Sequence, residues 1–207
     1  MKLDIKIINK NIFHIIFENK LEMTSTLLRI QEHYESPKFK GKVFTLGQYR
    51  EYYINKHGNF NYYEIVDGMN FPATAFNAFL KGSFDPLSEK EQYIIDRIAK
   101  GSACKYVIAT YGEADKETIE HEICHALYFT EESYRDQVNT IVDSYDMSDI
   151  KKWLKGQDYD EAVLNDEIHA YNVCDSKYLD EHNVATNPQM QSDLHKLRLK
   201  YKPKFKL

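Results

Sequence analysis

Short apolar runs separated by polar turn residues predict strands in the first half of the chain. The runs KLDIKII and IFHIIFE flank Asn9-Lys10-Asn11, a polar turn signal between two β-prone segments. This pattern predicts a β-hairpin. The β-branched run KYVIAT at 105–110, followed by the turn-like YGEAD, predicts one further short strand.

Helix start and stop signals divide most of the remaining chain. Polar capping residues precede apolar runs with helical spacing, and a proline or glycine often follows such a run. The predicted boundary signals are Pro37, Thr45 with Gln48, Gly58, Ser88 with Glu91, Asp115, Asp158 with Glu161, and Asn187-Pro188. Later helices are expected near 133–145, 149–155 and 159–174. We therefore expect an α+β fold that is rich in helix, with a small β-sheet in its N-terminal half.

No repeat and no Gly/Ser-rich or Pro-rich linker divides the sequence, so a single domain over 1–207 is expected. Residues 1–104 form an α+β part whose role the sequence does not indicate. The C-terminal residues 187–207 combine a helix start with alternating basic and apolar residues, and Pro203 favours an extended end. This basic tail is expected to be solvated, and docking to an acidic partner is the alternative.

Composition narrows the class of protein. The 207 residues carry a net charge of −5, which argues against nucleic acid as a main partner. No run is long enough to cross a membrane, and the N-terminal residues lack the features of a signal peptide, so a cytoplasmic protein is expected. The three cysteines share no CxxC spacing and are expected to stay reduced.

The stretch TIEHEICHALYF at 118–129 carries the clearest chemical motif. On a helix, His121 and His125 lie on one face about 6 Å apart, a separation at which two imidazoles can share a metal ion. Glu122 directly follows the first histidine. The helix has an apolar stripe of Ile119, Ile123, Ala126 and Leu127. The histidines lie roughly opposite this stripe, which disfavours core histidines and leaves a solvated surface pair as the alternative.

A metal site of this kind needs a third protein ligand. The continuation typical of metzincins is absent, because Tyr128 and Glu131 stand where its glycine and third histidine would be. In EAVLNDEIHAYNVC, Glu167 has only non-ionic neighbours at helical spacing, namely Val163, Leu164, Ala170 and Tyr171. A carboxylate on such a face is unfavourable unless it is paired or binds a cation. Glu167 is therefore the preferred ligand over Asp166 and His169, which are expected to be more exposed.

The combination KYVIAT, HEICH and DEIHAY resembles the gluzincin branch of the HExxH zincin metallopeptidases, over roughly residues 105–175. This resemblance implies one Zn²⁺ held by His121, His125 and Glu167. It also implies Glu122 as general base, a peptide or protein substrate, and an edge strand before the motif helix. The alternative for KYVIAT is an ordinary core strand. Tyr171 is a candidate donor to the oxyanion, with ordinary packing as the alternative. The gap from His125 to Glu167 is longer than in thermolysin-like enzymes, and Tyr171 stands where an acidic residue is usual.

Two other classes remain open. Glu122 with His125 and Asp166 with His169 can be interpreted as the paired carboxylate-x-x-His motifs of di-iron proteins, which would require inward glutamates such as Glu22, Glu32 or Glu91. A non-catalytic binding module with a structural metal is the other alternative. Cys124 is expected to point away from the histidine pair, so it would not complete a structural site of four ligands. Peptide deformylase is disfavoured because its Gly-rich and cysteine motifs are missing.

Overall fold

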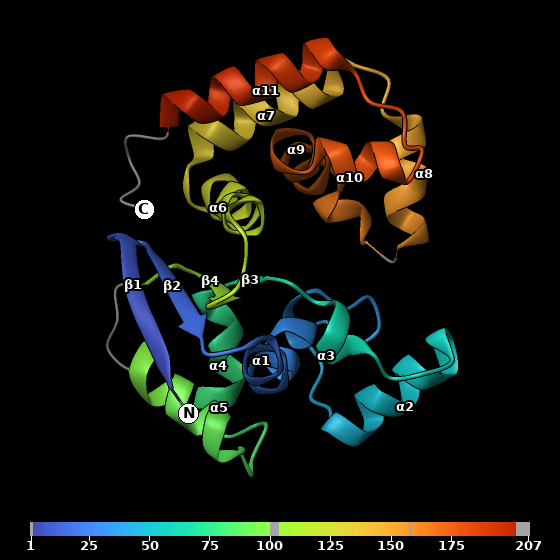
Figure 1. Ribbon diagram of the computed structural model, residues 1–207. Helices are drawn as coiled ribbons and strands as arrows, with labels where there is room; N and C mark the ends of the chain where they lie inside the picture. Colours follow the sequence, from blue (N-terminus) through green and yellow to red (C-terminus); the bar gives the residue numbers. More distant parts are fainter. Residues whose placement is uncertain (1, 100–103, 158, 202–207) are drawn as a thin grey trace. The chain divides into compact units, whose positions relative to one another are not determined.

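A computed structural model describes residues 2–99, 104–157 and 159–201 (Figure 1). The chain forms two compact units, Met1–Ala114 and Asp115–Leu207. The first unit contains a small sheet with helices and the second is helical among its described residues. The α+β class expected from the sequence is therefore confirmed. Whether the two units fold as the expected single domain stays a prediction. No described helix is long and apolar enough to cross a membrane.

The first unit is built on a sheet with the strand order β1-β2-β4-β3. Its strands are β1 (Leu3–Asn9), β2 (Ile12–Phe17), β3 (Met69–Pro72) and β4 (Tyr106–Tyr111). β1 and β2 form the predicted hairpin, which is antiparallel and has an irregularity between Ile7 and Asn9. β4 pairs parallel with β2 and antiparallel with β3. β4 is thus an internal strand with hydrogen bonds on both sides. The edge strand that the resemblance implies is wrong, and the alternative of a core strand is confirmed.

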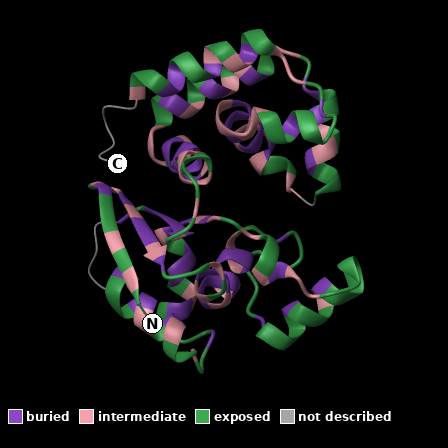
Figure 2. Ribbon diagram, viewed as in Figure 1, coloured by how far each residue is buried: buried purple, intermediate pink, exposed green. Residues whose placement is uncertain are grey.

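Helix α1 packs against β2, β3 and β4 in the first unit. The other helical elements of this unit are α2 (Leu46–His57), α3 (Tyr62–Ile65), η1 (Ala73–Phe76), α4 (Asn77–Leu80), α5 (Glu89–Ile94) and the π-helical turn η2 (Ile95–Ala99), with α1 spanning Lys20–Glu35. Many aromatic rings fill the core, including Phe39, Phe44, Phe76 and Phe84. Most of α2 stays exposed (Figure 2).

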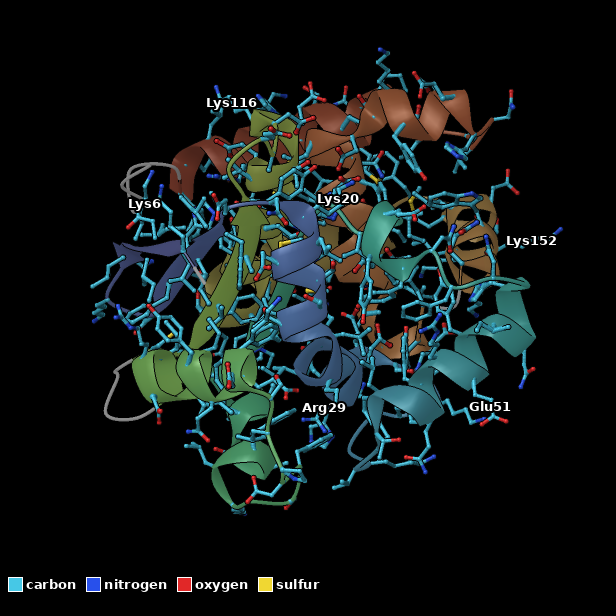
Figure 3. All side chains as sticks on the ribbon, turned by 60° about the horizontal axis from the view of Figure 1, so that its bottom comes forward. Lys6, Lys20, Arg29, Glu51, Lys116 and Lys152 are labelled. Carbon is cyan, nitrogen blue, oxygen red and sulfur yellow. The ribbon has the colours of Figure 1, made fainter. Side chains whose placement is uncertain are left out.

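A buried ion pair ties α1 to α5. The Arg29 guanidinium donates from Nε and Nη2 to both oxygens of Glu91, at 2.6 Å each. Only 15% of the Arg29 side chain and 5% of the Glu91 side chain are exposed. Figure 3 labels Arg29 on its helix. Because the carboxylate of Glu91 also accepts from the backbone N–H of Ser88, the same residue caps α5 and closes the interhelical pair.

The second unit is a set of packed helices. They are α6 (Lys116–Thr130), α7 (Glu132–Asp143), α8 (Ser148–Gly156), η3 (Glu161–Val163), α9 (Leu164–Cys174), α10 (Ser176–Glu181) and α11 (Pro188–Tyr201). α9 packs against α6, α7 and α11 on one side and against α8 and α10 on the other. In Figure 1, α6 and α9 lie side by side within this unit. This arrangement places the two helices with the predicted metal ligands in direct contact.

The structure confirms several of the helix boundaries predicted from the sequence. Thr45, Ser88 and Asp115 cap their helices as expected, and Gly58 ends α2 in the left-handed conformation. The oxygen of the Asn187 side chain accepts from the first N–H groups of α11, and Met190, Leu194 and Leu197 are buried. The predicted extended tail lies beyond the described residues. Asp158, expected to start the helix that carries Glu167, is also outside them, and Asp160 caps η3 directly before α9.

Candidate metal centre

The middle of α6 is buried all the way round. Residues 122–127 are all buried, and six consecutive helical residues point in every direction around the axis. The apolar stripe that the sequence predicts is buried at Ile123, Ala126 and Leu127, but His125 is only 3% exposed and Glu122 only 6%. The expectation that the histidines lie off the core is therefore wrong for His125, because α6 contacts both α7 and α9.

Three predicted ligands come together at the contact of α6 with α9. His121, His125 and Glu167 each place a ligand atom within 4.8 Å of the other two. The Nε2 atoms of His121 and His125 are 3.0 Å apart, and Glu167 Oε1 lies 3.7 Å from His125 Nε2. Tetrahedral zinc with bonds near 2.1 Å separates its ligand atoms by about 3.4 Å. The two distances that involve His125 Nε2, 3.0 and 3.7 Å, therefore lie close to the separation that the ion needs.

Each histidine is backed by a carboxylate at its other nitrogen. His125 Nδ1 lies 3.0 Å from Asp166 Oδ2, and His121 Nδ1 contacts Asp175 Oδ2. An Nδ1–H that donates to a carboxylate leaves Nε2 as the lone-pair nitrogen of a neutral imidazole. Two such lone pairs would then face each other across 3.0 Å. That contact is unfavourable unless a proton or a metal ion lies between the two nitrogens, which is the arrangement of a carboxylate–histidine–metal site.

The charges at the site also suit a cation. Burial alone would lower the pKa of His125, but the negative charges of Asp166 and Glu167 outweigh it and raise the pKa well above its usual value. The pKa of His121 is raised too, by its hydrogen bond with Asp175 against the effect of burial. Burial raises the pKa of Glu167. The negative charge around the two imidazoles therefore favours a cation at this place, either a proton on an imidazole or a metal ion bound by the two Nε2 atoms.

An oxygen of Glu167 is also left without a partner. Glu167 is 9% exposed, and its Oε2 is buried without a hydrogen bond. A buried carboxylate oxygen in that state is unfavourable by roughly 1–3 kcal/mol or more. The expectation that Glu167 faces inward is confirmed by its burial, and its unsatisfied oxygen lies at the end of the side chain that points toward the two histidines. The residues present therefore fit a divalent metal ion.

Asp166 and His169 differ in exposure. As expected, the Asp166 side chain is more exposed than that of Glu167, at 17% against 12%, whereas the expectation of an exposed His169 is wrong. His169 is fully buried, and its Nε2 pairs with the hydroxyl of Tyr134 on α7 at 2.6 Å. One carboxylate oxygen of Asp166 lies 3.0 Å from His125 Nδ1, and the other lies 3.8 Å from His169 Nδ1. These contacts form a chain from Tyr134 through His169 and Asp166 to His125. The prediction for His169 was wrong because the helical pattern does not show that α7 covers this face of α9.

The remaining predicted site residues lie on the same two helices. The negative charge of Glu122 contributes to the raised pKa values of both His121 and His125, so its carboxylate is near both rings. The ring of Tyr171 lies 5.1 Å from that of His121, edge to face. The Tyr171 hydroxyl is 3.4 Å from the hydroxyl of Tyr159, and burial raises its pKa, so the phenol stays protonated.

Sequence reasoning missed Asp175. In the gluzincin pattern an acidic residue is usual four positions after Glu167, where Tyr171 stands, whereas the structure supplies the carboxylate four positions further on, at Asp175. Asp175 is the residue that ends α9, so a helix with a continuous register does not predict where its side chain points. The available signal in the sequence was Asp175 itself, an acidic residue directly after the helix that carries the third ligand, Glu167.

The motif and its geometry are the only basis for a functional class. Comparison of the chain with family models, with curated proteins and with solved structures gave no match. The likeness to gluzincins therefore rests on the residues described above. Among the described residues, His121, His125 and Glu167 are the group whose ligand atoms converge closely enough to hold a metal ion.

Proposed function

We propose that this protein is a zinc-dependent metallopeptidase, which hydrolyses a peptide or related amide bond. The observation that carries the proposal is the convergence of His121 Nε2, His125 Nε2 and the Glu167 carboxylate, with a second carboxylate behind each imidazole. Zincin chemistry uses two histidines and one carboxylate as its ligand set. A zincin-like fold over roughly residues 105–175 is part of this proposal.

The donor set suits a catalytic zinc better than a structural one. Structural zinc normally has four protein ligands, and the group found among the described residues has three. When bound by three protein ligands, zinc keeps a position for water and lowers the pKa of that water toward about 7. Cys124, the nearest thiol in the sequence, faces Cys174 instead. A non-catalytic metal-binding module is therefore less well supported.

Residues of the chain carry out proton transfer, orientation of the two histidines and stabilisation of the oxyanion. Glu122 follows a ligand histidine in the sequence and is buried close to both imidazoles, so its carboxylate can accept the proton of an attacking water and return it to the leaving amine. Asp166 and Asp175 hold Nδ1–H of the two histidines and thereby fix the direction of Nε2. Tyr171, protonated and beside His121, is the proposed donor to the developing oxyanion.

The di-iron alternative has weaker support. It needs Asp166 and His169 as ligands, but Asp166 faces Nδ1 of His125 and His169 pairs with Tyr134. It also needs further glutamates from the first unit. There Glu91 is held by Arg29, Glu22 lies 2.9 Å from Lys90, and burial raises the pKa of Glu32 to about 7.

Glu122→Gln tests the proposed function. The purified variant and the wild-type protein would be loaded with one equivalent of zinc and incubated with a diverse peptide library, and cleavage would be followed by mass spectrometry. We expect the variant to keep zinc and to lose cleavage by at least about 100-fold, because general-base catalysis contributes about that much or more. Glu117→Gln, in the exposed first turn of the same helix, is the matched control. A Glu122→Gln variant as active as that control would overturn the mechanism.

A further inference from the structure

Two cysteines face each other across the same pair of helices. Cys124 on α6 and Cys174 on α9 place their sulfur atoms 3.7 Å apart, although 49 residues separate them in the chain. Cys124 is fully buried, whereas Cys174 is partly exposed. Neither residue belongs to the metal-ligand group, so this pair has no role in the proposed hydrolysis.

The geometry permits a covalent bond with little movement. A disulfide holds its sulfurs about 2.05 Å apart, so these two atoms need to approach by about 1.7 Å. Rotation about the Cα–Cβ bonds and a small shift of the helices can supply that distance. α6 and α9 are directly packed, and the pair lies within one compact unit. Bond formation therefore needs no unfolding of the helices that carry it.

A cavity reaches one of the two cysteine residues. The cavity has a volume of about 310 Å³ and is lined by Lys116, Glu117, Glu120, Val173, Cys174, His195, Arg198 and Leu199. Cys174 is part of this lining and Cys124 is not. Figure 3 labels Lys116, at the exposed start of α6. A reagent entering the cavity therefore meets Cys174 first, and Cys124 lies behind it as the second thiol.

The charges of the lining indicate which reagent fits. The lining has two basic residues, Lys116 and Arg198, and two acidic residues, Glu117 and Glu120, so its charges are balanced. Arg198 donates to Glu120 at 2.7 Å, and Lys116 is adjacent in sequence to Glu117. A lining of this kind does not concentrate a strongly charged molecule. It admits a small uncharged oxidant such as hydrogen peroxide.

We propose that Cys124 and Cys174 form a redox-active pair, in which hydrogen peroxide oxidises Cys174 and Cys124 then closes a reversible disulfide. In the first step the Cys174 sulfur attacks one peroxide oxygen and the O–O bond breaks. The sulfur keeps that oxygen as sulfenic acid, and the other oxygen takes the Cys174 thiol proton and leaves as water. In the second step the Cys124 sulfur attacks the sulfur of that sulfenic acid. The S–O bond breaks, the S–S bond forms, and the oxygen leaves as a second water with the Cys124 proton.

The bond joins the two helices that carry the metal ligands. Cys124 directly precedes His125, and Cys174 directly precedes Asp175, the carboxylate behind His121. The oxidised protein holds α6 and α9 together covalently whether or not a metal is bound. The redox pair does not depend on the proposed peptidase activity, and its test needs no substrate.

The test uses the full chain and hydrogen peroxide. Reduced protein, freed of reductant, would be treated with a small excess of peroxide, then denatured and alkylated, and its free thiols counted by mass. We expect the three thiols of the chain to fall to one, with a proteolytic fragment in which Cys124 is linked to Cys174. A thiol reductant should restore all three. Cys104→Ser is the matched control and should form the same bond.

Two single variants test the order of the steps. Cys124→Ser lacks the second thiol, so sulfenic acid should accumulate at Cys174 and react with dimedone. Cys174→Ser should leave Cys124 reduced under the same treatment. The proposal is overturned if native wild-type protein keeps three thiols at peroxide levels that oxidise the unfolded chain, if the linked fragment joins two chains or includes Cys104, or if dimedone labels Cys124 in preference to Cys174.

Discussion

Asp166 and Asp175 should each strengthen metal binding without touching the metal. Asn at either position keeps the size of the side chain and an oxygen that can accept from Nδ1–H, but it removes the negative charge. If His121 and His125 bind zinc through Nε2, both Asp166→Asn and Asp175→Asn should weaken zinc binding and retain a stoichiometry of one. This result would distinguish a residue that orients a ligand from the ligand itself.

The structure indicates which substitution has the larger effect. Loss of such a supporting carboxylate typically weakens metal affinity 10–100-fold, which corresponds to about 1.4–2.7 kcal/mol. His125 has a side chain only 3% exposed, against 15% for His121, and Asp166 is slightly less exposed than Asp175, at 17% against 22%. A charged hydrogen bond is stronger where less water competes. We therefore expect about 100-fold for Asp166→Asn and about 10-fold for Asp175→Asn.

The assay is a zinc competition titration against a fluorescent chelator at neutral pH. Asp180→Asn, an exposed position on α10, is the matched control and should bind zinc as the wild type does. Circular dichroism melting of each metal-free variant shows whether it is folded. If Asp166→Asn binds zinc within about twofold of the control, the carboxylate does not orient His125 toward a metal. If a folded Asp166→Asn binds none, Asp166 is itself a ligand and the three-ligand site is wrong.

Three further predictions concern stability. Tyr134→Phe removes the hydroxyl partner of the fully buried His169 and should lower the free energy of unfolding by about 1–3 kcal/mol in urea titration, and an unchanged value would contradict the buried chain of contacts. Arg29→Met leaves the Glu91 carboxylate buried without its guanidinium and should lower the same quantity by about 3 kcal/mol; a loss below about 1 kcal/mol would mean that the ion pair is solvated. The folded metal-free chain holds protons at the two motif histidines and at Glu167 more tightly than the unfolded chain, because all three pKa values are raised. Its stability should therefore fall as pH rises through and above the ordinary pKa values of these groups, 4.5 for Glu and 6.5 for His, and bound zinc should reverse that slope in thermal melts.

Local signals predicted much of the fold. Capping residues such as Thr45, Ser88 and Asp115 act through contacts within a single helical turn, so the sequence contains all the information needed to place them. The position of β4 in the sheet could not be predicted from local signals. Strand order depends on pairing between β2, β3 and β4, which are far apart in the chain, and no local pattern in KYVIAT distinguishes an internal strand from an edge strand.

The sequence predicted the site best at a residue whose charge is unfavourable among its expected neighbours. Glu167 could be identified because an ionisable side chain among non-ionic neighbours needs a partner. His169 was misjudged because its burial depends on α7, which contributes Tyr134 from 35 residues away. The burial of His125 was missed for the same reason, since periodicity identifies one apolar face and α6 is covered on more than one.

Metal content measured on protein purified without added metal tests the central claim most directly. Elemental analysis of wild-type protein and of Glu167→Ala, with folding of both checked by circular dichroism, addresses the ligand set that unites the motif with α9. The account predicts one zinc per chain in the wild type and none retained by the folded variant. Equal zinc in the two proteins, or two irons per chain in the wild type, would contradict it.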